Sequence, residues 1–313
     1  MRDFQLPGRS AAIASHAMAA TSHPLATLTA IDVLRAGGSA ADAAVAACAV
    51  QCVVEPAMTG IGGDCWVLYA PASGGVDALN GSGWAPALAT AETLLGQGLH
   101  AIPDGSAHSV TVPGAFRSWQ LLLDKHGRKG LDVLLQPAIR FARDGFTVHP
   151  RVAFDWDRAA ARLERSDAGK AYYLPNGAAP RPGDTVRLEK LAETLETIAK
   201  RGADAFYEGP IASAMVATLE GFGGLHSEAD FAAFQPEWVE PISATYKGVR
   251  VYECPPNGQG VIALLMMQIL EQLELDGLDP NGPERLHLEA EATRLAFRDR
   301  DRLIADPRQN AVP

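Results

Sequence analysis

The chain has 313 residues, 47% of them hydrophobic and 20% charged, and its 27 Lys and Arg against 37 Asp and Glu give a net charge of −10. This balance is too apolar for a disordered chain, and no basic cluster points to nucleic acid. Apolar runs such as residues 261–267 are much shorter than the ~20 residues of a membrane helix. The N-terminal segment, residues 1–7, lacks the apolar core of a signal peptide. We therefore predict a soluble, cytoplasmic protein with no nucleic-acid and no membrane partner.

The four cysteines point away from a redox or metal-binding role. Cys48 and Cys52 lie four residues apart, which matches neither a Cys-x-x-Cys redox motif nor a zinc pattern. The set, with Cys65 and Cys254, is also too small for a disulfide scaffold. We expect unpaired, buried thiols.

Two helices are predicted at the start of the chain. Residues 24–35 form the first, which the glycines after Ala36 bring to an end. Ser39 is placed as the N-cap of the second helix, residues 40–52, and Asp42 three residues later completes an approximate capping box. This second helix is built of Ala, Val and Cys and carries no charge after Asp42, so it offers no face to water. We expect it to be packed on both sides.

A glycine-dense loop, residues 56–64, follows and leads into a strand at 65–70 with a hairpin partner at 76–79. A dinucleotide-binding loop needs a strand before it and a helix after it, so this loop does not indicate a nucleotide site. We instead expect Gly62 and Gly63 to pass close to the active centre or the neighbouring strand, with at least one of them at positive φ.

The rest of the chain reads as mostly helical. The apolar spacing predicts a helix led by residues 111–114, helices over 137–145, 188–199, 262–273 and 283–303, and a strand over 249–254. The last helix carries a dense charge run, which we interpret as a solvated face with i,i+3 and i,i+4 pairs. Length alone would favour two domains, but without repeats or an obvious linker we predict one domain over residues 1–313.

The common signatures of catalysis and metal binding do not occur. The sequence has no Gly-x-Ser-x-Gly elbow, no His-Glu-x-x-His and no paired Cys-x-x-Cys, and its eight histidines are scattered. We therefore place no catalytic residue, no metal ligand and no cofactor in this chain.

Ordered motifs along nearly the whole chain nevertheless resemble one family, the γ-glutamyltranspeptidases. They lie at residues 17–24, 34–46, 54–56, 60–63, 111–114, 137–139, 145–146, 202–209, 255–260 and 296–307. A dozen motifs in family order and at fitting separations are far more specific than any one of them. We identify the chain as a member on that basis, with the oxamate amidohydrolase-like members as one branch to consider.

The resemblance implies an α+β fold, the four-layer αββα sandwich of the N-terminal-nucleophile hydrolases. In that family a proenzyme cleaves itself, and the new N-terminal Thr of the small subunit becomes the nucleophile. Its own α-amino group, with a pKa near 8, can serve as the base. The resemblance thus implies that this chain is the large subunit, that its partner is a small subunit from the same proenzyme, and that the nucleophile follows Pro313.

The resemblance also implies a substrate-binding segment after the hairpin. In γ-glutamyl enzymes an arginine in a Gly-Arg-Glu-x-Ala-Pro-like stretch binds the α-carboxylate of the substrate. Here Ser82 stands at the arginine position and Gly83 at the acid position, followed by Trp84. Serine cannot replace a bidentate Arg–carboxylate pair. Trp84 either closes the pocket that the arginine would fill or is an ordinary core residue.

We therefore predict the large subunit of an autoprocessed amide hydrolase that acts on a small or acyl amide. One alternative is a true γ-glutamyltransferase or glutathione hydrolase with altered carboxylate recognition. Another is a non-enzymatic paralogue that keeps the fold. The predicted substrate-binding residues are Ser82, Gly83 and Trp84, and the loop glycines expected near them are Gly62 and Gly63.

Overall fold

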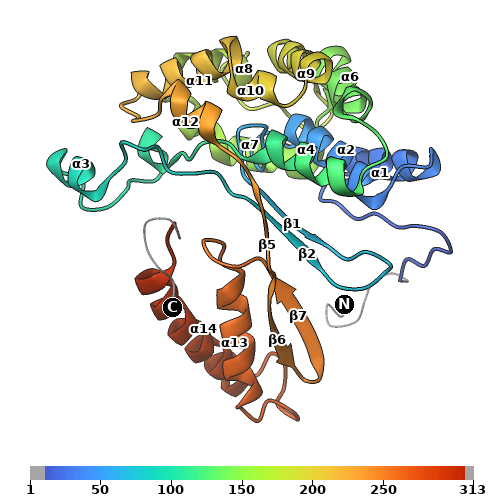
Figure 1. The fold of residues 1–313 in the computed structure, drawn as a ribbon, viewed down its shortest axis with the longest axis vertical. Coiled ribbons are helices and arrows are strands. Elements are labelled where there is room, and N and C mark those ends of the chain that lie inside the picture. The colour runs from blue at the N-terminus through green and yellow to red at the C-terminus, as the bar shows by residue number, and fades with distance from the viewer. Residues whose placement is uncertain (1–10, 307–313) are drawn as a thin grey trace.

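The computed structural model describes residues 11–306, so the expectations for residues 1–7 and for the chain beyond Asp306 lie outside the described residues. Figure 1 shows two layers of helices above a sheet, which we call the helical body (residues 11–239), and a smaller C-terminal lobe below it (residues 240–306). The helices of the body are α1 (Pro24–Arg35), α2 (Ala40–Val54), α3 (Ala91–Gly96), α4 (Ala115–His126), α5 (Leu131–Leu134), α6 (Gln136–Asp144), α7 (Pro150–Leu163), α8 (Asp167–Tyr173), α9 (Glu189–Arg201), α10 (Asp204–Tyr207), α11 (Pro210–Gly221) and α12 (Glu228–Ala233).

The described strands pair only in antiparallel fashion, in three small sheets. Mixed helices and antiparallel strands confirm the α+β class. The sheet of the body contains β1 (Cys65–Tyr69), β2 (Asp77–Gly81) and β5 (Glu237–Val239). A second, two-stranded sheet in the body pairs β3 (Phe146–Thr147) with β4 (Thr185–Val186). The sheet of the lobe pairs β6 (Ile242–Tyr246) with β7 (Val249–Glu253).

The predicted start of α2 is confirmed atom by atom. Ser39 Oγ accepts a hydrogen bond from the amide of Asp42 (3.1 Å), and the Asp42 carboxylate accepts one from the amide of Ser39 (2.7 Å). Asp42 is fully buried, and its carboxylate also accepts from the amides of Arg128 and Lys129. A buried carboxylate is tolerated when backbone donors satisfy it in this way. The capping box thus also ties α2 to the loop after α4.

The predicted burial of α2 is confirmed as well. Eleven of its fifteen residues are buried, and the helix packs against α1, α4 and α6. The exposed positions Ala40, Ala44 and Cys48 are each one turn apart and so share one narrow face. The expectation of buried cysteines is therefore wrong for Cys48. Cys65 is half-buried, Cys52 and Cys254 are buried, and all four thiols are free.

The glycine-dense loop behaves differently from the prediction. Neither Gly62 nor Gly63 has positive φ, so that expectation is wrong. The Gly63 carbonyl does make a close approach, because it accepts from the amides of Gly114 (2.9 Å) and Ala115 (3.2 Å) at the start of α4. The loop therefore serves as an acceptor for the otherwise unpaired N–H groups at a helix N-terminus.

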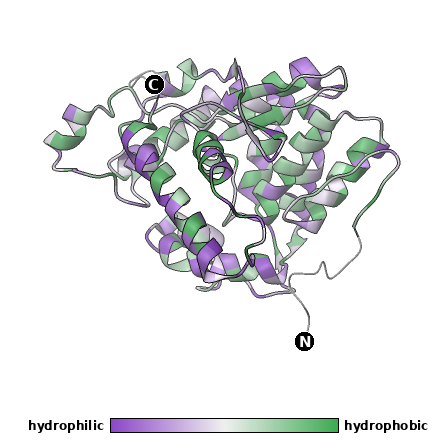
Figure 2. Ribbon diagram, turned by 90° about the horizontal axis from the view of Figure 1, so that it is seen from below, coloured by the Kyte–Doolittle hydropathy of each residue, from purple (hydrophilic) through white to green (hydrophobic). Residues whose placement is uncertain are grey.

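The C-terminal lobe consists of the β6–β7 hairpin, α13 (Gly260–Glu271) and α14 (Pro283–Leu303). The predicted solvated face of α14 is confirmed by the exposed pairs Arg285–Glu289 (2.7 Å) and Glu291–Arg294 (2.9 Å). Helix α13 is almost entirely apolar, yet only two of its twelve residues are buried. Figure 2 shows, from below, apolar and polar residues mixed along the helices. The lobe therefore leaves apolar surface of α13 uncovered.

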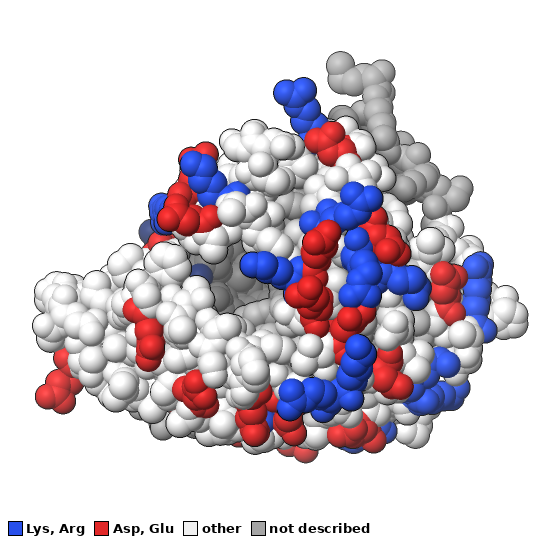
Figure 3. Space-filling model, turned by 90° about the horizontal axis from the view of Figure 1, so that it is seen from above, with Lys and Arg blue, Asp and Glu red and all other residues white. Residues whose placement is uncertain are grey.

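Two features of the described residues bear on membrane and nucleic-acid binding. Among residues 11–306 we find no helix that combines the length and the apolarity needed to cross a bilayer. The face in Figure 3 carries acidic and basic side chains interspersed, without a stripe of one sign. That mixture is unlike the basic footprint of a nucleic-acid-binding surface.

Candidate substrate pocket

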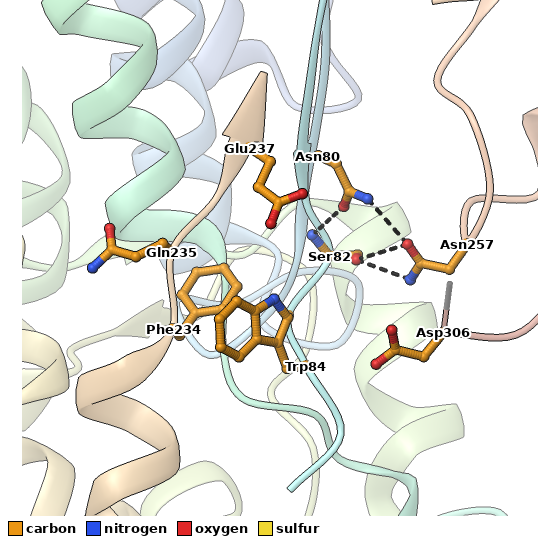
Figure 4. Close-up of a pocket in the computed structure, with 9 residues that line it drawn as sticks. Asn80, Ser82, Trp84, Phe234, Gln235, Glu237, Asn257 and Asp306 are labelled. Atoms are coloured by element: carbon orange, nitrogen blue, oxygen red, sulfur yellow. Dashed lines mark hydrogen bonds between the residues drawn. The ribbon is translucent and has the colours of Figure 1, made fainter. Parts of the chain in front are cut away.

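A small pocket lies where the helical body meets the C-terminal lobe (Figure 4). It encloses about 40 Å³, and it draws on the end of β2, the start of β5, the loop after β7 and the segment after α14. Its lining residues are Asn80, Ser82, Gly83, Trp84, Phe234, Gln235, Glu237, Asn257 and Asp306. All three predicted substrate-binding residues are therefore brought together in one pocket.

The segment after β2 is held in place by close backbone contacts. Gly83 has φ of +83°, and a Cβ there would lie 1.9 Å from the carbonyl oxygen of Val112. Only glycine fits such a position without moving the neighbouring backbone. One residue later, the Trp84 carbonyl accepts from the amide of Val112 (2.8 Å). The positive φ expected in the earlier loop is thus found at Gly83, in the pocket itself.

Ser82 belongs to a network of neutral side chains. Asn257 Nδ2 donates to Ser82 Oγ (3.0 Å), the Ser82 amide donates to Asn80 Oδ1 (3.1 Å), and Asn80 Nδ2 donates to Asn257 Oδ1 (3.1 Å). The network joins β2 to the loop after β7. A nucleophilic serine needs a base beside its hydroxyl, and here the partner is a carboxamide. The Ser82 hydroxyl is therefore a hydrogen-bonding group of the pocket and not an activated nucleophile.

Trp84 and Phe234 form an aromatic wall of the pocket. Their ring centroids lie 5.5 Å apart with an interplanar angle of 72°, an edge-to-face arrangement. Trp84 is half-buried and packs against the core, while Phe234 is buried. Trp84 therefore lines the pocket and also packs at the edge of the core.

Arg117 of α4 positions this wall from behind. Its side chain is only 7% exposed, and Nη1 donates to the carbonyls of Phe231 (3.3 Å), Ala232 (2.9 Å) and Phe234 (2.5 Å). Nε donates to the Asp204 carboxylate (3.0 Å). These carbonyls lie at the C-terminal end of α12, where a helix leaves carbonyls unpaired and attracts a cation. Arg117 thus fixes the point at which the chain enters the pocket.

The charge of the pocket is negative. Glu237 is paired directly opposite Asn80 in the β2–β5 register, and residues directly opposite in an antiparallel pair project from the same face of the sheet. Asp306 is the second carboxylate in the lining. Among the described residues that line the pocket there is neither Lys nor Arg. The positive charge that an arginine would supply at position 82 is therefore not supplied by another described residue of the lining.

Other reactive groups among the described residues do not form a second centre. No cluster of three or more His, Cys, Asp or Glu side chains in residues 11–306 is arranged to hold a metal ion. Burial raises the pKa of Cys52 and of Cys65 to about 12, so both thiols stay protonated at neutral pH.

Several lining residues were not predicted from the sequence. Phe234, Glu237, Asn257 and Asp306 lie 150 to 222 positions after Trp84 in the chain. Glu237 could have been predicted from its pairing opposite Asn80 in the β2–β5 register. That inference requires β5, and no strand was predicted from the sequence at those residues. The loop of Gly62 and Gly63 does not line the pocket, although the Gly63 carbonyl is bonded to the Gly114 amide.

Comparison with known proteins gives a consistent set of relatives. The family model described as gamma-glutamyltranspeptidase matches residues 26–313. The glutathione hydrolase-like YwrD proenzyme of Bacillus subtilis is 35% identical over 303 residues, which is 96% of this chain and 57% of that protein. The oxamate amidohydrolase proenzyme of Klebsiella pneumoniae is 34% identical over 305 residues, again 96% and 57%. The chain thus spans a little over half the length of these relatives.

Solved structures agree. The γ-glutamyltranspeptidase of Helicobacter pylori superposes with a TM-score of 0.89 at 30% identity, covering 97% of this chain and 88% of that one. The cephalosporin acylase of Bacillus halodurans gives a TM-score of 0.86 at 35% identity, covering 98% and 59%. These proteins are named for different amide substrates, so similarity of the backbone alone does not select one.

Proposed function

This chain belongs to the γ-glutamyltranspeptidase family, and from that premise we propose that it is the large subunit of an autoprocessed amide hydrolase. Its partner is a small subunit released from the same precursor, whose N-terminal Thr attacks the amide carbonyl. The large subunit, residues 1–313 as one domain, supplies the pocket that orients the substrate. The substrate is a small or acyl amide.

Three observations support this proposal. Relatives of several names are proenzymes and hydrolases, among them a glutathione hydrolase, an acylase and an oxamate amidohydrolase. The chain matches about half of their length. Among residues 11–306 the pocket offers a hydrogen-bonding and aromatic surface but no activated nucleophile. That division of labour fits a recognition subunit whose chemistry is delivered by a partner.

The observation that carries the choice of substrate is Ser82. An arginine would hold a carboxylate by two charge-assisted hydrogen bonds, which serine cannot provide. Ser82 is moreover hydrogen-bonded to Asn257, and none of the lining residues that the structure describes is a Lys or Arg. Loss of one partner of a buried charge pair weakens binding by about 2–5 kcal/mol. We therefore expect poor turnover of γ-glutamyl amides.

The test uses the complete precursor. Intact mass after purification should show two chains, and kcat/KM should be low for a γ-glutamyl 4-nitroanilide and higher for other amides in a panel of small and aromatic acyl anilides. The variant Ser82→Arg, alone and with Gly83→Glu, should raise γ-glutamyl turnover and lower turnover of the preferred amide.

Two outcomes would favour the alternatives. Vigorous γ-glutamyl turnover by the unmodified enzyme would identify a γ-glutamyltransferase or glutathione hydrolase whose carboxylate partner lies elsewhere. A precursor that stays a single chain and cleaves no amide would identify a non-enzymatic paralogue.

A further inference from the structure

We propose that the pocket of Ser82, Glu237 and Asn257 binds an N–H-donating, uncharged or cationic end of the substrate, such as a primary carboxamide or an ammonium, and discriminates against a carboxylate. This inference rests on the proposed function and specifies the substrate class for that site.

The first step of the argument is the placement of the Glu237 carboxylate. Its register position opposite Asn80 directs it to the face of the sheet on which the pocket lies. Figure 4 shows its carboxylate directed towards Asn80 and Ser82. Glu237 is solvent-exposed, so a ligand can reach its carboxylate. An ionised carboxylate accepts hydrogen bonds and cannot donate one.

The second step is the state of the neutral network. The Asn257 carbonyl oxygen accepts from Asn80 Nδ2 and from the Ser82 hydroxyl (3.3 Å), and the Asn257 amide nitrogen donates one of its two hydrogens to Ser82 Oγ. The Asn80 carbonyl oxygen accepts from the Ser82 amide and keeps a second lone pair. The network can therefore complete a hydrogen bond with a carboxamide, but it carries no positive charge to offset a carboxylate.

The third step is the aromatic wall. The Trp84 ring stands edge-to-face with Phe234 and contributes to the same lining as Glu237. An aromatic face attracts a cation and does not attract an anion. A carboxylate brought between this wall and Glu237 would meet a like charge in a partly desolvated site, whereas an ammonium or carboxamide N–H would meet an acceptor.

The experiment uses the processed two-chain enzyme and four 4-nitroanilides that differ only in their end group. They are the glutaryl compound (carboxylate), its methyl ester, its primary amide and the 4-aminobutanoyl analogue (ammonium). We expect kcat/KM for the amide and the ammonium to exceed that for the ester by about ten-fold, and the carboxylate to fall below the ester by about ten-fold.

The variant Glu237→Gln separates this explanation from a general loss of fit. It should reduce the preference for the ammonium over the ester by about ten-fold and raise turnover of the carboxylate relative to that of the ester. Glu240→Gln, an exposed carboxylate three residues away that does not line the pocket, is the matched control and should leave all four values unchanged. Equal melting temperatures would show that both variants fold.

The outcomes divide the two proposals. If the ester is cleaved and the carboxylate is cleaved as well or better, or if Glu237→Gln lowers all four substrates equally, the inference is overturned while the amide hydrolase stands. If none of the four compounds and no other amide is cleaved by the processed enzyme, the proposed function fails, and the inference fails with it.

Discussion

Helices α2 and α13 are both built almost entirely of apolar residues, but the chain treats them in opposite ways. In α2 eleven of fifteen residues are buried, whereas in α13 only two of twelve are. Helix α2 is enclosed by other helices of the body, and α13 is covered on one side by the β6–β7 hairpin and α14. The amino-acid composition does not distinguish the two helices, and their difference in burial comes from the elements that pack against each of them.

Helix α2 is thus enclosed within the body, whereas the apolar residues of α13 outside its two buried positions are half-buried, and only its polar residues Gln268 and Glu271 are exposed. Half-buried apolar surface along a helix is typical of an interaction site, and the small subunit proposed above is the partner that we expect to cover α13. The pocket lies at the junction of these two regions, with Asn80 and Ser82 from the body and Asn257 from the lobe. A partner bound to α13 would therefore also stabilise the lobe side of the pocket, where Asn257 lies.

The largest expected effect contrasts one charge placed in each helix. Val50→Asp places a carboxylate at a fully buried, apolar position of α2. It should lower the free energy of unfolding by more than about 4 kcal/mol and prevent soluble expression. Ile269→Asp in half-exposed α13 should leave the body folded and weaken association with the small subunit. Soluble yield and thermal unfolding of the precursor measure the first effect, and gel filtration of the processed enzyme measures the second. Equal losses would remove the distinction between the two helices.

A second test addresses how the body holds the pocket wall. Arg117→Ala removes the donors to three carbonyls at the end of α12 and should cost about 2–4 kcal/mol, measured by denaturant unfolding. Its carboxylate partners Asp204 and Glu208 are largely exposed and so lose little. Arg294→Ala, which breaks an exposed pair on α14, is the control and should change stability by less than about 0.5 kcal/mol. If the two variants lose similar amounts of unfolding free energy, Arg117 does not stabilise the end of α12.

A third test compares two glycines. Gly83→Ala should cost about 1–3 kcal/mol, because Gly83 has positive φ and the new Cβ would meet the Val112 carbonyl. Gly62→Ala should be nearly neutral, since nothing lies within 4 Å of the Cβ position and φ is not positive. The measurement is the melting temperature of each variant relative to the unmodified protein. A costly Gly62→Ala with a tolerated Gly83→Ala would reverse the assignment.

The smallest expected effect is a pH dependence of the body. Burial lowers the pKa of His23 from its ordinary 6.5, partly opposed by Glu55 and aided by His149. The unfolded chain therefore takes up this proton first as pH falls, so stability declines from roughly pH 6.5 downwards, until the folded pKa is passed. His23 Nδ1 caps α1 by accepting from the Leu25 amide (3.1 Å).

The variant His23→Asn keeps a capping acceptor and removes the titration. It should flatten the fall in unfolding free energy between roughly pH 6.5 and 5, while the exposed control His100→Asn should not. An unchanged slope in His23→Asn would assign the pH dependence to other groups.

Local patterns in the sequence were enough for much of the fold. The Ser39–Asp42 capping box and the charged α14 were predicted because each depends on residues within a few positions of one another. Of the pocket, only the continuous segment of Ser82, Gly83 and Trp84 was predicted from the sequence. Its remaining contacts, such as Ser82 with Asn257, join positions 175 residues apart, and no local periodicity encodes such a pairing.

The most direct test of the comparison is oxidation of methionines by dilute peroxide, read by mass spectrometry in residues 1–313 alone and in the processed two-chain enzyme. Met266 and Met267 lie on α13, and Met18, 62% exposed, is the internal reference. If a second chain covers α13, oxidation of Met266 and Met267 relative to Met18 will fall several-fold in the processed enzyme. An unchanged ratio would contradict the claim that the open face of α13 is the place where the second subunit completes this molecule.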